Sequence, residues 1–433
     1  MKKVALHNLG CKVNAYEMEV MQQMLTENGF QIVPFEQESD VYIVNTCSVT
    51  NIADRKSRQM LHRAKKRNPD AVVVAVGCYV QTRDETEILA DGVDLVIGNN
   101  RKKDLVTILN HYFEGLTEET VIDINHTNEY ESMMLKETAE HTRAYIKVQD
   151  GCNQFCSYCI IPYARGRVRS RQRAEVLEEV TRLSEKGYKE VVLTGIHLSS
   201  YGTDTGDSLL SLIEAVHAIK GIERIRLGSL EPRIVTEVFV KALAGMEKIC
   251  PHFHLSLQSG CEATLKRMNR HYTPEEYRAG VMLLRNYFHH PAITTDVIVG
   301  FPGETEEEFE ECRAFLEEIQ FYETHVFKYS KRQGTRAAMM DNQIPERVKT
   351  ERSNVLLTLN AQMKRKFEEE LIGAETELLI EEKIEIDGEE WQVGHTKEYV
   401  RAVMKSSEDL SGKIVKARLT GWASDGSMTS RRI

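Results

Sequence analysis

The sequence predicts an α/β protein with three folded parts: a small N-terminal parallel α/β domain, a central partial (β/α)6 barrel and a small C-terminal all-β barrel. Three observations predict this order. Apolar strand-like runs alternate with helical stretches up to about residue 108, and the same alternation resumes between residues 141 and about 330. Short alternating strands fill the chain from residue 371 onward. Continuous apolar runs are typical of buried parallel strands, and alternation is typical of half-buried strands.

Composition is that of an ordinary globular protein. The chain has 433 residues, of which 41% are hydrophobic and 28% charged, and at roughly 150 residues per domain this length suits two to four domains. No apolar run approaches the roughly 20 residues that a membrane span requires. The first residues, "MKKVALHNLGC", lack the apolar region and cleavage site of a signal peptide. We therefore expect a cytoplasmic protein that makes no contact with membranes.

The first predicted domain covers residues 1–108. Its helices are "AYEMEVMQQMLTENG", which ends at Gly29, and "ADRKSRQMLHRAKKRNP", which Pro69 stops. Its strands are "KVALHNL", "DVYIVNT", "AVVVAVG" and "VDLVIG". Residues 109–140 are polar and irregular, and we interpret them as a linker.

The central domain is predicted over residues 141–370. Six strand candidates are separated by helical stretches: "RAYIKVQ", "EVVLTGI", "RIRLGSL", "FHLSLQS", "ITTDVIVG" and "THVFKYS". Six βα units suggest an open version of the eight-unit barrel, with reactive residues on loops at the carboxyl ends of the strands. A long charged helix over residues 347–373 leads out of this domain. Residues 371–433 then predict a β-barrel of a kind that often binds nucleic acid, although a structural cap would show the same pattern.

Three cysteines, Cys152, Cys156 and Cys159, stand close together in "GCNQFCSYC", directly after the first strand of the central domain. Two thiols make a redox pair and four make a zinc site, whereas three hold three corners of a four-iron cluster and leave one iron open. A redox pair in "CSYC" would leave Cys152 unexplained.

A zinc site is the other alternative, and it needs further ligands. "CPHFHLSLQSGC" offers four: Cys250, His252, His254 and Cys261. We favour a structural explanation, in which strand alternation places the two histidines on one face and the two cysteines are small loop hydrophobes. Cys312 lies on a helical stretch and is interpreted as buried packing.

Three other cysteines occupy matching places in the first domain. Cys11, Cys47 and Cys78 follow its first, second and third strand runs. The carboxyl ends of parallel strands share one edge of a sheet, where ligands usually bind, so we expect these thiols to converge. The alternative is three buried cysteines that act as small hydrophobes.

The chain carries a formal net charge of −10, which argues against a general nucleic-acid coat but allows a local basic patch. In "ARGRVRSRQR", alternation places five arginines on one face if the segment is extended, and we predict that this face contacts RNA. They are Arg165, Arg167, Arg169, Arg171 and Arg173. A second basic stretch covers residues 56–67. In the C-terminal part, Arg418 and Trp422 are candidates to grip or stack on RNA, or to serve as surface and core.

The motif "GCNQFCSYC" resembles the C-x3-C-x-aromatic-C signature of radical S-adenosylmethionine (SAM) enzymes, and the whole chain resembles a methylthiotransferase with a C-terminal TRAM domain. "LGCKVNAYEME", "NTCSVTNIADRKSR" and "PYARGRVRSR" are most similar to the type that acts on N6-threonylcarbamoyladenosine at position 37 of tRNA. The type that acts on isopentenyladenosine usually has "GCQMN" at the first cysteine, and the type that acts on a ribosomal protein has "GCPKN".

The resemblance implies two 4Fe–4S clusters, each with an open iron. Cys152, Cys156 and Cys159 would hold the cluster that cleaves SAM to a 5′-deoxyadenosyl radical. Cys11, Cys47 and Cys78 would hold an auxiliary cluster carrying sulfide or polysulfide, the source of the methylthio sulfur. The radical removes hydrogen from C2 of the adenine, and the methylthio group joins that carbon.

The resemblance also implies SAM contacts and partners. The contact positions are Tyr158, Gly195, Ser229, Glu231 and Gly300. For the two glycines, loop architecture is the alternative explanation. The partners would be the tRNA anticodon loop and an electron donor such as a flavodoxin or ferredoxin, and the protein is expected to be a monomer. Three other functions stay open: modification of isopentenyladenosine in tRNA, modification of an aspartate of a ribosomal protein, and a non-catalytic iron–sulfur RNA-binding protein. The intact "LGSLEP" and "DVIVGFPGET" segments argue against the last of these.

Overall fold

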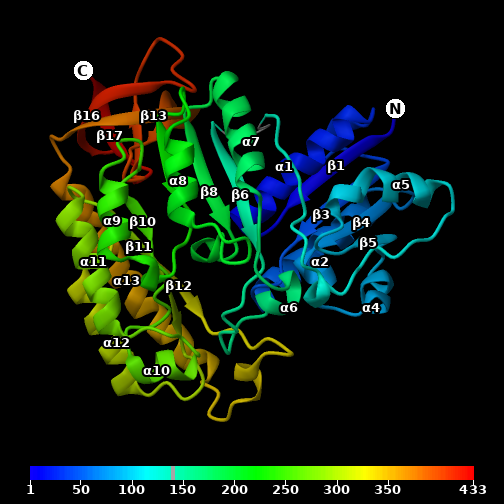
Figure 1. Cartoon of the computed structure of the whole chain (residues 1–433), viewed down its shortest axis with the longest axis horizontal. Helices are drawn as coiled ribbons and strands as arrows, with labels where there is room; N and C mark the ends of the chain where they lie inside the picture. Colours follow the sequence, from blue (N-terminus) through cyan, green and yellow to red (C-terminus); the bar gives the residue numbers. More distant parts are fainter. Residues whose placement is uncertain (138–141) are drawn as a thin grey trace.

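The structure is a computed structural model that describes residues 1–137 and 142–433. Figure 1 shows an N-terminal sheet beside a larger central sheet, with a small barrel at the far end of the latter. The predicted three-part α/β fold is therefore confirmed. Among the described residues, no helix is long and apolar enough to cross a membrane.

The N-terminal sheet is wholly parallel, in the order β2-β1-β3-β4-β5. Its strands are β1 (Lys3–Asn8), β2 (Gln31–Val33), β3 (Val41–Thr46), β4 (Val72–Gly77) and β5 (Leu95–Ile97). Its helices are α1 (Lys12–Glu27), α2 (Asn51–Arg67), α3 (Cys78–Gln81), α4 (Glu85–Ala90) and α5 (Leu105–Phe113).

Both faces of this sheet are buried, which explains its unbroken apolar strands. Alternate residues pack in opposite directions: Ile43 lies in the cluster with α1 and α5, whereas Val44 lies in the cluster with α2 and α4. The three-residue edge strand β2 was not predicted from the sequence. The helix α5 also runs five residues past the predicted boundary at residue 108, and the boundary at residues 140 and 141 falls outside the described residues.

The central part contains six parallel strands and one short antiparallel strand. They are β6 (Arg143–Asp150), β7 (Arg169–Ser170), β8 (Glu190–Gly195), β9 (Arg224–Leu227), β10 (His252–His254), β11 (Ala292–Val299) and β12 (Glu323–Lys328). Single bridges, Ile225 to Ile249 and Leu230 to Leu255, join β6-β8-β9 to β10-β11-β12. These six parallel strands form the predicted partial barrel.

Helices cover the outer face of this barrel. They include α7 (Arg173–Glu185), α8 (Leu209–His217), α9 (Glu237–Ala244), α11 (Pro274–Tyr287) and α12 (Glu306–Ile319), with the short α6 (Ile161–Arg165) and α10 (Glu262–Arg267) in loops. Apolar strand residues such as Leu193, Ile225 and Val297 pack against these helices. Because side chains alternate along a strand, their polar neighbours point to the inner side, which we call the lumen.

The chain leaves the barrel through α13 (Glu346–Glu370) and enters a closed barrel in the order β13-β14-β15-β17-β16. Its strands are β13 (Glu375–Ile386), β14 (Glu389–His395), β15 (Arg401–Met404), β16 (Ile414–Trp422) and β17 (Met428–Arg432). The long helix and the small all-β barrel were both predicted, although the last strand, β17, was not.

A buried network of charges joins the N-terminal sheet to the central barrel, and α1 carries its centre. The carboxylate of Glu17 receives hydrogen bonds from Lys147 of β6 (2.7 Å), from Arg165 of α6 (2.7 Å) and from Lys102. All four side chains are at most 1% exposed. Although desolvation raises it, Arg165, Lys102 and Lys147 together hold the pKa of Glu17 well below its usual range.

We expect Glu17→Gln to destabilise the fold by about 3–5 kcal/mol, because it leaves three buried cations without their shared counter-charge. Urea unfolding followed by circular dichroism measures this change. The matched control is Glu27→Gln on the same helix, whose pair with Lys136 is about half exposed and should contribute about 1 kcal/mol or less. Equal losses in the two variants would contradict a central role for Glu17.

Candidate functional site

Cys11, Cys47 and Cys78 follow three neighbouring strands, β1, β3 and β4, at the same edge of the N-terminal sheet. Cys11 is the N-cap residue of α1, Cys47 comes one residue after β3, and Cys78 is the first residue of α3. The preceding Gly10 has φ +107°, and a Cβ there would lie 3.1 Å from the Cys47 Sγ. Burial raises the pKa of Cys47 to about 12, and the neighbouring Cys78 adds to this shift. The thiols therefore converge.

A buried arginine lies against this thiol group. Arg165 donates from Nε to the Cys78 Sγ (3.3 Å) and from Nη2 to the Asn14 Oδ1 (2.6 Å), and its side chain is fully buried. A guanidinium keeps its charge in proteins and accepts no hydrogen bond. Its contact with a sulfur atom therefore favours a negatively charged group at this position, either a thiolate or a cluster.

Cys152, Cys156 and Cys159 lie on the loop after β6, at the carboxyl end of the barrel. Here too an arginine donates to sulfur: Arg270 Nη1 is 3.3 Å from the Cys156 Sγ. Burial raises the pKa of Cys152 to about 11 and raises that of Cys159 further. The two thiol groups thus share one feature, an arginine bonded to a sulfur, and differ in that Cys11 is exposed whereas the other five cysteines are partly or fully buried.

The spacing of the sulfur atoms tests whether each group fits a single ion or a cluster. Two sulfurs that are each about 2.3 Å from one zinc ion are at most about 4.6 Å apart. Among the residues that the structure describes, neither group of three cysteines has all of its Sγ atoms within 4.8 Å of one another. This wider spacing does not fit one zinc ion. A four-iron cluster does not require so close an approach, because each thiolate binds a different iron.

The structure brings together a different set of possible metal ligands from the set considered in the sequence analysis. No three of Cys250, His252, His254 and Cys261 come together in the described part of the chain, whereas His254, Asp296 and His325 have ligand atoms within 4.8 Å of one another. His254 Nε2 lies 3.4 Å from the Asp296 carboxylate. These residues come from three adjacent strands, β10, β11 and β12, so only the strand register relates them.

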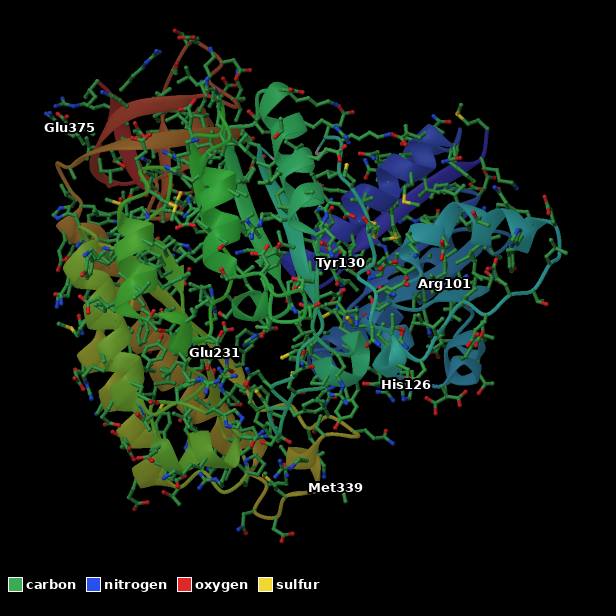
Figure 2. The ribbon with its side chains drawn as sticks, viewed as in Figure 1. Arg101, His126, Tyr130, Glu231, Met339 and Glu375 are labelled. Carbon is green, nitrogen blue, oxygen red and sulfur yellow. The ribbon has the colours of Figure 1, made fainter. Side chains whose placement is uncertain are left out.

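The predicted SAM contacts all follow barrel strands at the end that carries the Cys152 loop. Tyr158 lies beside Cys156 and Cys159, with its ring edge toward Phe301 at 6.4 Å. Glu231 is buried in the central part, where Figure 2 labels it, and accepts a hydrogen bond from Arg233 (3.1 Å). Ser229 is exposed two residues before it.

The two glycines in that set have packing reasons of their own. A Cβ at Gly195 would lie 2.8 Å from the Gln149 Oε1, and one at Gly300 would lie 2.3 Å from the Lys349 side chain. Gly300 also has φ +69°. Loop architecture therefore explains both glycines without a ligand, and their contact with SAM stays a prediction.

The prediction that five arginines share one exposed face is wrong. Residues 161–165 form α6 instead of an extended segment, and Arg165, Arg169 and Arg171 are at most 1% exposed. Arg171 pairs with the buried Glu179 of α7. Only Arg167 and Arg173 of the five reach the surface, and Arg173 pairs with Asp207.

The two C-terminal candidates are also engaged. Trp422 donates from its indole nitrogen to Glu368 of α13 (2.9 Å), and the guanidinium of Arg365 covers its ring at 3.1 Å. Arg418 is partly exposed and pairs with Glu375, which Figure 2 labels on this barrel. Trp422 therefore holds the small barrel against α13, and stacking on RNA would require the opposite ring face.

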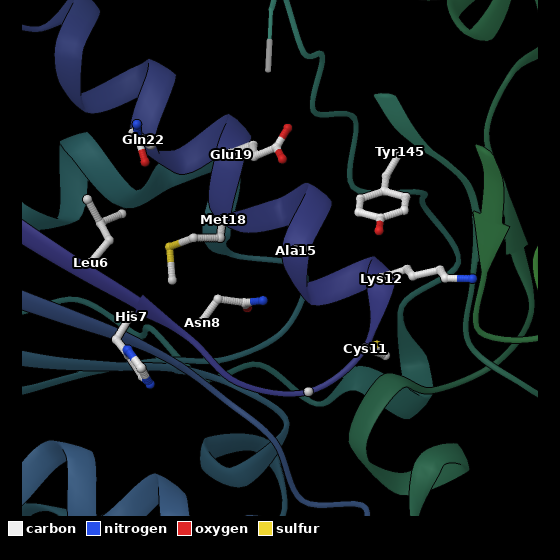
Figure 3. Close-up of a pocket in the computed structure, with 11 residues that line it drawn as sticks. Leu6, His7, Asn8, Cys11, Lys12, Ala15, Met18, Glu19, Gln22 and Tyr145 are labelled. Atoms are coloured by element: carbon white, nitrogen blue, oxygen red, sulfur yellow. The ribbon is translucent and has the colours of Figure 1, made fainter. Parts of the chain in front are cut away.

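Sequence analysis missed the charged residues that line the lumen. Lys12, the first residue of α1, lies in a cavity of about 500 Å³ together with Cys11, Glu19 and Tyr145 (Figure 3). Desolvation, with Arg226 and Arg143 nearby, lowers the pKa of Lys12 to about 8. The strand alternation that points these arginines inward was visible in the sequence, but their meeting with Lys12 was not.

The sequence matches two known protein families. Residues 146–316 match the Radical SAM superfamily, and residues 3–98 match Uncharacterized protein family UPF0004. The MtaB threonylcarbamoyladenosine tRNA methylthiotransferases of Bacillus subtilis and Aquifex aeolicus are each 42% identical to this chain, covering 97% and 88% of it and 94% and 93% of their own lengths.

A tRNA-2-methylthio-N(6)-dimethylallyladenosine synthase of Acetivibrio thermocellus is 36% identical over 99% of this chain and 91% of its own length. Among solved structures, the radical SAM methyltransferase TsrM from Kitasatospora setae, with tryptophan and a SAM analogue bound, matches with a TM-score of 0.57. At 18% identity, over 76% of this chain and 73% of that one, the likeness shows the fold alone.

We expect Arg171→Ala to destabilise the protein by about 3–5 kcal/mol, because it leaves the buried carboxylate of Glu179 without its counter-charge. Arg167→Ala is the matched control: its guanidinium is exposed and packs over Phe155 at 4.5 Å, a contact worth about 1 kcal/mol or less. Urea unfolding of both variants measures the difference. If Arg171→Ala proved as mild as Arg167→Ala, the buried pair would not support the fold.

Proposed function

This chain belongs to the family of radical SAM methylthiotransferases that modify tRNA, and from this premise we propose that it adds a methylthio group to C2 of N6-threonylcarbamoyladenosine at position 37. As a radical SAM enzyme it uses SAM and a 4Fe–4S cluster. The two relatives with 42% identity are named for threonylcarbamoyladenosine, whereas the dimethylallyladenosine synthase is 36% identical. This difference supports the threonylcarbamoyl substrate.

One observation carries the proposal: the chain has two separate three-cysteine groups, one after strands of the N-terminal sheet and one after β6 of the barrel, and each has an arginine bonded to a sulfur. A single cluster would suffice to generate a radical. A second group with its own cation is what a sulfur source requires. We assign Cys152, Cys156 and Cys159 to the radical SAM cluster, and Cys11, Cys47 and Cys78 to an auxiliary cluster that carries sulfide or polysulfide.

When bound, the first cluster and SAM supply the radical chemistry, and the second supplies the sulfur. The protein's own residues hold and orient these groups. Arg165 and Arg270 donate hydrogen bonds to the sulfurs of Cys78 and Cys156, and their charge would offset the negative charge of a bound cluster. Tyr158, Gly195, Ser229, Glu231 and Gly300 border the place where SAM would bind.

The macromolecular partners follow from this activity. The anticodon loop of tRNA must reach the lumen, and of the arginines predicted to contact RNA, Arg167, Arg173 and Arg418 reach the surface, where they would contact its phosphates. A small redox protein such as a flavodoxin or ferredoxin would reduce the clusters. We propose that the protein works as a monomer in the cytoplasm.

We expect the anaerobically reconstituted protein to hold about eight irons per chain and Cys47→Ala to hold about four. The wild type, given tRNA, SAM and a reductant, should produce a methylthio mass gain on threonylcarbamoyladenosine in digested nucleosides, and Cys47→Ala should not. Iron analysis and mass spectrometry of nucleosides make the two measurements.

The matched control is Cys250→Ala, which removes a buried cysteine outside both groups and should keep eight irons and activity. Equal iron in the wild type and Cys47→Ala would rule out the auxiliary cluster. A mass gain on dimethylallyladenosine instead would keep the chemistry and overturn the substrate, and a product on ribosomal protein alone would overturn tRNA as the substrate class.

A further inference from the structure

Lys12 is a cation inside the lumen for which the protein provides no counter-ion. It follows Cys11 directly, and Figure 3 shows its ammonium group pointing away from α1 toward the barrel strands. Among the described residues, no carboxylate pairs with it and no acceptor binds it. Its side chain is accessible to solvent yet surrounded by protein, which is the situation of a group lining an open cavity.

The other lumen charges near Lys12 are matched. Arg226 pairs with Glu190 (2.8 Å) and Arg143 with Glu381 (3.5 Å). Asp296 lies within electrostatic range of Lys12, but its carboxylate is beside His254. Lys12 is therefore one positive charge in excess beside two arginines that already have carboxylate partners. Such a place favours a ligand with a negative group.

The proposed substrate carries such a group. A threonylcarbamoyl substituent ends in a carboxylate, whereas a dimethylallyl substituent has no charge. In adenine, N1 alone separates C2 from the carbon that bears N6, so the substituent lies on the same edge of the ring as the reacting carbon. With C2 held at the auxiliary cysteines, the substituent extends from the immediate neighbourhood of Cys11. A lysine next in sequence, on its flexible four-carbon stem, is placed to meet it.

We propose that Lys12 binds the threonyl carboxylate of the substrate and thereby selects threonylcarbamoyladenosine over adenosines with an uncharged N6 substituent. This inference rests on the proposed function. Lys12 is a specificity-determining residue in it and takes no part in radical formation. A charge-assisted hydrogen bond of this kind should be worth a factor of about 10–100 in kcat/KM.

The rival role for Lys12 is to compensate the charge of a cluster held by its neighbour Cys11. The two roles differ in their dependence on the substrate. Loss of a carboxylate contact harms only substrates that carry the carboxylate, whereas loss of a cluster contact harms every substrate equally and changes the iron content or the spectrum of the cluster.

The test uses two anticodon stem-loop RNAs that are identical except that the threonyl carboxylate of one is replaced by a neutral carboxamide. The full-length reconstituted wild type should prefer the carboxylate RNA about 10- to 100-fold in kcat/KM. Lys12→Gln should bring the ratio close to one by losing activity on the carboxylate RNA alone, with unchanged iron content. Lys12→Arg should restore most of the preference.

Lys56→Gln is the matched control, because it removes a lysine beside another auxiliary cysteine, Cys47, in a separate cavity. It should leave the ratio of the two RNAs unchanged even if it weakens both. An unchanged ratio in Lys12→Gln, or equal losses on both RNAs, would overturn the inference while leaving the proposed function intact. Failure of the wild type to modify the carboxylate RNA would instead overturn the proposed function.

Discussion

The buried carboxylate of Glu17 holds the two halves of the site in one geometry. It forms ion pairs with Lys102 of its own domain and with Lys147 and Arg165 of the barrel. Arg165 also contacts the Cys78 sulfur and the carboxylate of Asp150. Hydrogen bonds are directional, so this network sets both the distance and the rotation between the domains. Buried ion pairs contribute little net stability compared with apolar packing. We therefore interpret this network as fixing the position of the N-terminal domain relative to the barrel.

The same reasoning extends to the far end of the lumen. Arg224 and Arg226 of β9 donate to backbone carbonyls of His395, Glu377 and Lys397 in the C-terminal barrel. Tyr399 lies between Arg143 and Arg226, with each guanidinium 4.7 Å from its ring, and adopts φ +71°. A backbone conformation that is costly for a tyrosine persists only where its surroundings impose it. The C-terminal barrel therefore closes the floor of the lumen.

Sequence reasoning succeeded where a pattern is local and failed where partners are distant. The convergence of Cys11, Cys47 and Cys78 was predictable, because each follows an apolar strand and parallel strands share an edge. The prediction of one arginine face failed, because alternation cannot reveal that Arg171 pairs with Glu179. Nor can it reveal that Arg165 pairs with Glu17, 148 residues earlier. Lys12 was missed for the same reason: its significance depends on strands far along the chain. The short strands β2 and β17 carry too few residues for a periodic signal.

The burial of these arginines changes how an acidic chain can recognise RNA. Non-specific affinity for RNA rises with the number of phosphates that cations neutralise. Here three of five arginines in the basic segment are used inside the protein, and the formal net charge is −10. Of these five, Arg167 and Arg173 remain at the surface to contact the phosphate backbone. We therefore expect recognition to depend on the modified base inside the lumen as well as on the strand outside, and the proposed role of Lys12 acts on the modified base.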